Sequence, residues 1–80
     1  MTPEPAADVS VDCRGRPCPV PVVELARALA DAAVGAVVEV VSDDPAARHD
    51  VPAWARMRGQ EYLGEVPHAG GTGYRVRRTG

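Results

Sequence analysis

The 80-residue sequence has no lysine and no phenylalanine, and these absences exclude some chemistry. All nine basic residues are arginines, so a catalytic lysine Schiff base is excluded. One tryptophan and two tyrosines leave few side chains to stack on nucleic-acid bases, and the formal net charge is −2. We therefore expect no direct nucleic-acid binding. Two cysteines are too few for a disulfide framework, which favours a cytoplasmic protein with reduced thiols.

Long apolar runs are also missing. None approaches the roughly 20 residues that a membrane-spanning helix needs, so we expect no membrane association. The first residues, 1–7, are rich in proline and carry an acid, and they show no apolar signal-peptide segment. We expect a disordered tail over 1–7 and a single domain over 8–80, which is small enough that its chemistry must be shallow.

Hydrophobic periodicity predicts a strand followed by a helix in the first half of the chain. Val9, Val11 and Cys13 alternate with polar residues over 8–13, so the cysteine should share the inner face of the strand with the valines. Apolar residues then recur at helical spacing over 19–32.

A valine-rich strand is predicted over 36–42. Its one charged residue, Glu39, should face solvent, which places Val38 and Val40 toward the core. Val37 and Val41 would then lie on the face of Glu39 and leave an apolar surface that a weak dimer could use.

The next segment predicts a second helix, divided in two by proline. Asp43 and Asp44 precede a proline, and helix capping accounts for both carboxylates. Pro52 is unfavourable inside a helix, so we expect a short turn over 45–49 and a separate helix over 51–58.

The remaining chain predicts two strands, 61–66 and 74–78, joined by a glycine-rich loop over 67–73. The order is then β-α-β-α-β-β. This order predicts a two-layer α+β sandwich, in which two helices cover one face of a four-stranded mixed sheet.

Cys18 is the strongest candidate for a reactive group. It follows Gly15, lies between Pro17 and Pro19, and directly precedes the predicted helix. An isolated cysteine is most often a small buried hydrophobe. Here the cysteine lies at the expected N-cap, where free N–H groups and the helix dipole favour the thiolate. Gly15, Pro19 and Pro21 are expected to support its geometry by forming the turn and starting the helix rigidly.

The other candidate groups have simpler interpretations. Cys13 and Cys18 are five residues apart, which is not the spacing of a redox or zinc-binding pair. We expect Cys13 to fill the core, His49 to be solvated in a helical turn, and His68 to be solvated in the glycine-rich loop. We expect no metal site.

The sequence resembles the TusA/SirA family of small sulfur-carrier proteins. The resemblance rests on the pattern D-x-x-G-x-x-C-P-x-P that begins at Asp12, and it continues in D-D-P-A from Asp43, in D-V-P from Asp50 and in Trp54. It extends to the strand around Tyr74 and implies the fold predicted above.

The resemblance also implies a function. Cys18 would receive sulfane sulfur as a persulfide from a cysteine desulfurase or a rhodanese-type donor. It would pass the sulfur to an acceptor protein in tRNA thiolation, molybdenum-cofactor maturation or sulfur metabolism. The chain would be a sulfurtransferase without a metal or organic cofactor. Candidate partner-docking residues are Arg14 and Arg16 beside the cysteine, and Met57 and Arg58 at the end of the second helix.

Three other hypotheses remain open at this point. An RNA-binding module would need a basic face with exposed aromatic residues. A regulatory interaction domain would have a purely structural cysteine, unreactive in the folded state. A dithiol redox protein would form a reversible disulfide between Cys13 and Cys18.

Overall fold

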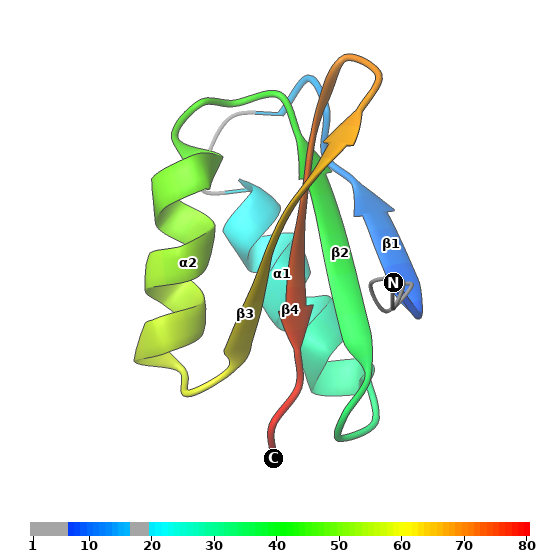
Figure 1. Ribbon diagram of the computed structural model, residues 1–80, viewed down its shortest axis with the longest axis vertical. Helices are drawn as coiled ribbons and strands as arrows, with labels where there is room; N and C mark the ends of the chain where they lie inside the picture. The colour runs from blue at the N-terminus through cyan, green and yellow to red at the C-terminus, as the bar shows by residue number, and fades with distance from the viewer. Residues whose placement is uncertain (1–6, 17–19) are drawn as a thin grey trace, which may run out of the picture.

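The computed structural model describes residues 7–16 and 20–80, and the side chains from 21 onward in the second range. Strands and helices alternate and then end in a hairpin, as the sequence predicts (Figure 1). The elements are β1 (Val9–Asp12), α1 (Val20–Asp31), β2 (Val37–Ser42), α2 (Ala47–Met57), β3 (Glu61–His68) and β4 (Gly71–Arg77).

The four strands form one mixed sheet in the order β1-β2-β4-β3. β1 and β2 are parallel because α1 crosses over between them, whereas β4 is antiparallel to both of its neighbours. Both helices pack on the same face of the sheet (Figure 1). The predicted two-layer β-α-β-α-β-β fold is confirmed.

Strand direction brings the chemically interesting segments to one end of the molecule. β1 and β2 end at the same edge, both helices begin there, and the β3–β4 turn at Ala69 and Gly70 lies there too (Figure 1). The opposite end holds the C-terminus of α2 and the end of the chain. With 11 residues, α2 separates the two ends by about 16 Å.

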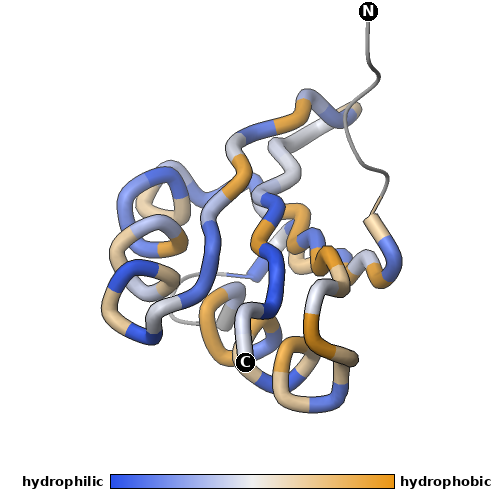
Figure 2. The backbone as a smooth tube through the Cα atoms, turned by 60° about the horizontal axis from the view of Figure 1, so that its bottom comes forward, coloured by the Kyte–Doolittle hydropathy of each residue, from blue (hydrophilic) through white to orange (hydrophobic). Residues whose placement is uncertain are grey.

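The core lies between the sheet and the helices. Leu25 and Leu29 of α1 pack with Val38, Val40 and other buried side chains of the two layers. Hydrophobic and hydrophilic residues alternate around the turns of both helices, as expected for helices that cover a sheet (Figure 2). The predicted inward orientation of these β2 valines is confirmed.

The second helix differs from the sequence prediction. α2 runs unbroken, with Pro52 inside it. Proline has no N–H for the carbonyl of Arg48, which costs one helical hydrogen bond. Val51 and Ala55 are fully buried in the core, so packing outweighs that local cost. The expectation that Asp44 caps this helix is wrong: the N-cap is Ala46, which has no side-chain capping bond, and Asp44 accepts the Ala46 N–H at 2.9 Å in the turn before the helix.

The β3–β4 hairpin is longer than predicted. The strands continue through His68 and restart at Gly71, so the expected seven-residue loop is a two-residue turn. Glycine usually weakens a strand, which is why the glycine-rich sequence favours a loop here. Here Gly71 lets the start of β4 lie close to the end of β2, because a Cβ on Gly71 would be only 2.9 Å from the Ser42 carbonyl oxygen.

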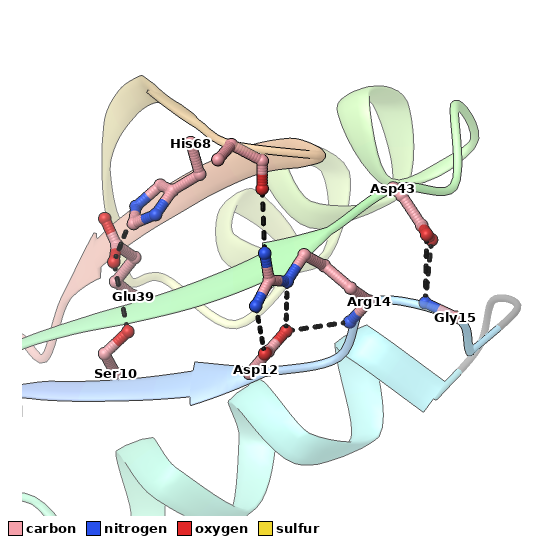
Figure 3. A network of polar contacts seen from close by, with 8 residues as sticks. Ser10, Asp12, Arg14, Gly15, Glu39, Asp43 and His68 are labelled. Carbon is pink, nitrogen blue, oxygen red and sulfur yellow. Dashed lines mark hydrogen bonds and ion pairs between the residues drawn. The ribbon is translucent and has the colours of Figure 1, made fainter.

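Glu39 does not face solvent, which corrects the prediction. It lies on the sheet face opposite the helices but is only 3% exposed. Its carboxylate accepts a hydrogen bond from Ser10 at 3.1 Å and lies 3.2 Å from His68 Nε2 (Figure 3). It also accepts a hydrogen bond from Arg75 at 3.0 Å. Burial by itself would raise the pKa of Glu39, but these hydrogen bonds outweigh it and lower the pKa.

Two further expectations about this face are also wrong. Val37 and Val41 are buried, so they leave no apolar surface for a dimer. His68 belongs to β3 rather than to a loop, and its imidazole pairs with the Glu39 carboxylate instead of being simply solvated. Gly73 makes room for this pair, since a Cβ there would lie 2.6 Å from Glu39 Oε1 and 2.9 Å from His68 Cδ2.

Candidate functional site

The cysteine-bearing segment joins the end of β1 to the start of α1, at the edge where β2 also ends. Cys18 and Pro19 themselves lie outside the described residues, so the N-cap position of the thiol stays a prediction. The flanking residues are described, and they determine how the segment leaves the sheet and enters the helix.

Gly15 forms the corner of a turn before the cysteine. The Arg16 N–H donates to the Cys13 carbonyl at 3.1 Å, and Gly15 has φ +81°. These are features of a type II turn, which requires glycine at this position. The predicted supporting role of Gly15 therefore has a backbone reason.

Asp43 holds this turn from a distant part of the chain. The Gly15 N–H donates to both carboxylate oxygens of Asp43, each at 3.0 Å (Figure 3). The expectation that Asp43 caps a helix is wrong, because its carboxylate accepts the Gly15 N–H instead. Two adjacent acids before one helix start were a signal of this, since one cap needs only one carboxylate.

Arg14 links the turn to the β3–β4 hairpin. Its guanidinium donates to both oxygens of Asp12 at 2.9 and 2.7 Å, and to the Ala69 carbonyl at 2.8 Å (Figure 3). The side-chain hydrogen bonds between Asp12 and Arg14 lower the pKa of Asp12 to about 2 and raise that of Arg14. Arg14 therefore forms an ion pair with Asp12. The side chain of Arg16 is exposed.

The Asp12 carboxylate should make stability depend on acid pH. Its pKa falls from an ordinary 3.8 to about 2 in the folded protein, so the ionised form stabilises the fold above 3.8. That contribution is lost as the pH falls from 3.8 toward 2. Denaturant titrations at several pH values should show a weaker acid dependence for Asp12→Asn than for the unmodified protein. Identical pH dependence in both would contradict the bond to Arg14.

The start of α1 is anchored in the core. Pro21 lies in the first helical turn, where proline is tolerated, and its side chain is fully buried. Its part in fixing the geometry of the cysteine stays a prediction. In the first turn of α1 as described there is no acidic residue.

Cys13 is fully buried in the core, as the alternation of β1 predicts. Its N–H donates to the Val41 carbonyl at 2.7 Å, and burial raises the pKa of its thiol. Both observations suit a core residue and not a resolving thiol. Val11 packs against the same core, but Val9 is exposed because β1 is an edge strand.

Met57 and Arg58 lie at the end of the molecule opposite Arg14 and Arg16. Met57 is 74% exposed, and Arg58 lines a cleft of about 350 Å³ with Trp54, Arg78 and neighbouring residues. The structure therefore does not bring the four predicted docking residues together. They form two separate patches at opposite ends of α2. His49 is exposed, as expected.

The fold and the site together define a class: a small two-layer α+β domain that carries a C-P-x-P segment between a sheet edge and a helix start. The family model described as Sulfurtransferase TusA matches residues 9–78. The chain therefore belongs to the TusA family of sulfur carrier proteins.

Similar proteins support the same assignment. The sulfur carrier protein TusA of Pseudomonas entomophila is 35% identical over 71 residues, which is 89% of each chain. That of Pseudomonas aeruginosa is 32% identical over 73 residues, or 91% of this chain and 92% of the relative. A SirA-like protein of Desulfitobacterium hafniense has a crystal structure with a TM-score of 0.72 and 28% identity, covering 90% of this chain and 99% of that one.

Among the described residues, no helix is both long and apolar enough to cross a membrane.

Proposed function

We propose that the chain is a sulfurtransferase that carries sulfane sulfur as a persulfide on Cys18. The observation that carries this proposal is the place of Cys18 in the family motif, two residues before α1 and three after the Gly15 turn. The first N–H groups of a helix have no partner within the helix and attract negative charge. No carboxylate in the described first turn of α1 competes for them.

The transfer is a balanced exchange between sulfur atoms. The Cys18 thiolate attacks the terminal sulfur of a donor persulfide, the donor S–S bond breaks, and the donor leaves as a thiolate. A new S–S bond forms on Cys18, so no external oxidant is needed. An acceptor thiolate then attacks the outer sulfur and releases Cys18 as a thiolate. The carrier itself uses no metal and no organic cofactor in these steps.

A carrier of this kind works with sulfur-relay partners. We propose a cysteine desulfurase or a rhodanese-type enzyme as donor and a relay protein with a reactive thiol as acceptor. Arg16, with Arg14, would contribute to docking beside the cysteine, and Met57 with Arg58 would contribute at the far end of α2. A compartment with reduced thiols, the cytoplasm, suits this chemistry.

A chase experiment tests the function. The protein is loaded with a cysteine desulfurase and cysteine, purified from both, and then mixed with an acceptor that presents a low-pKa thiol. Intact-protein mass spectrometry should show the gain of one sulfur atom on loading and its loss after mixing. Sulfur that stays on the chain in the presence of excess acceptor thiol would contradict a carrier role.

A further inference from the structure

Two consecutive residues before the cysteine are tied to two different segments of the chain. Arg14 binds the β3–β4 turn through the Ala69 carbonyl, and Gly15 binds Asp43 at the end of β2. Figure 3 shows both contacts just after the end of β1, where the chain turns at Gly15. The base of the segment is thus held from two sides.

From this geometry we propose that Asp43 is a positioning residue for the reaction of Cys18. The inference rests on the proposed function, because it assigns Asp43 a part in presenting the same thiol. Asp43 would act through Gly15, which lies three residues before Cys18, and not by touching the sulfur.

The carboxylate is well placed to act as a fixed anchor. Asp43 directly follows Ser42, which is 2% exposed and whose hydroxyl accepts the Asp44 N–H at 3.1 Å. Asp44 in turn accepts the Ala46 N–H in the turn that precedes α2. Asp43 is therefore held between a buried strand end and a hydrogen-bonded turn, although its own side chain is exposed.

The hydrogen bond also suits the turn that it holds. In a type II turn the N–H of the third residue takes no part in the hydrogen bond that closes the turn. The N–H of Gly15 is that group, and both oxygens of Asp43 receive it. A Cβ on Gly15 would meet nothing within 4 Å, so glycine is needed there for its backbone conformation and not for space.

Positioning and charge predict opposite effects, which makes the proposal testable. As a charge, Asp43 would oppose ionisation of the Cys18 thiol, so its removal would make Cys18 more reactive. As an anchor, its removal would loosen the approach to α1, weaken the influence of the helix N-terminus, and make Cys18 less reactive. Asp43→Asn keeps an oxygen acceptor without the charge, whereas Asp43→Ala removes both.

The experiment compares these two variants with Asp50→Ala, which removes an exposed acid from the first turn of α2. Three quantities are measured: the Gly15 amide exchange rate by NMR, the alkylation rate of Cys18 against pH by peptide mass spectrometry, and the sulfur-loading rate.

Asp43→Ala should speed Gly15 exchange, raise the apparent thiol pKa, and slow both Cys18 reactions about tenfold, less than the roughly 100-fold cost of a 1 Å misplacement. Asp43→Asn should keep most of the activity, and Asp50→Ala should match the unmodified protein.

Cys18 reaction rates that fall as the Gly15 exchange rate rises across the variants support the proposal. Unchanged rates in Asp43→Ala, or a loss without faster Gly15 exchange, would overturn it. Slow alkylation of the buried Cys13 checks that each variant is folded. Alkylation needs no sulfur donor, so this test stands even if the unmodified protein accepts no sulfur, an outcome that would contradict the proposed function alone.

Discussion

Cys18→Ser is expected to abolish sulfur loading completely. A persulfide needs a thiolate that can form an S–S bond, and a serine hydroxyl neither ionises near neutral pH nor accepts sulfane sulfur. The remaining cysteine, Cys13, is fully buried and its thiol pKa is raised, so it cannot take over the reaction. Intact-protein mass spectrometry after treatment with a cysteine desulfurase and cysteine measures the effect directly.

The matched control is Cys13→Ala. It removes the second thiol without placing a hydroxyl in the core, and it should still gain one sulfur atom. A sulfur adduct that persists in Cys18→Ser, or that disappears in a folded Cys13→Ala protein, would show that the reactive cysteine has been wrongly assigned.

Glu39→Ala is expected to lower the free energy of unfolding by about 3 kcal/mol, because it takes one partner from a buried, hydrogen-bonded ion pair. The carboxylate is almost fully buried and accepts from Arg75, Ser10 and His68. Its removal also leaves a gap above Gly73, which this side chain now covers. Chemical denaturation monitored by circular dichroism gives the difference.

Glu61→Ala provides the matched control for burial. Glu61 pairs with Arg77 at 3.0 Å, the same distance as Glu39 from Arg75, but its side chain is half exposed. An exposed pair contributes at most about 1 kcal/mol, so this variant should be nearly as stable as the unmodified protein. Equal losses in Glu39→Ala and Glu61→Ala would mean that burial of Glu39 does not determine its contribution.

The contrast between Cys13 and Glu39 shows how far the sequence alone could predict this fold. Strand alternation placed Cys13 correctly, because it depends only on neighbours in the chain. The same rule predicts the correct face of the sheet for Glu39 but wrongly predicts that its side chain is exposed to solvent. The partners that bury it, Ser10 and Arg75, are 29 and 36 residues away in the sequence. Neither partner forms a local pattern with Glu39.

The same limit applies to the candidate site. The motif around Cys18 indicates the chemistry, and it places Gly15 in the turn before the cysteine. The hydrogen bond between Gly15 and Asp43 spans 28 residues, whereas Pro45 favours a local capping explanation that neither Asp43 nor Asp44 meets. Likewise, Pro52 is a local obstacle to a helix that the burial of α2 overcomes.

The measurement that tests the central claim most directly is peptide mass spectrometry of the unmodified protein after sulfur loading. The donor and excess thiols are removed, free thiols and persulfides are trapped by alkylation, and the peptides containing Cys13 and Cys18 are compared. The account predicts one additional sulfur atom on the Cys18 peptide and none on the Cys13 peptide. Sulfur on the Cys13 peptide, or a disulfide joining the two cysteines in place of a persulfide, would contradict it.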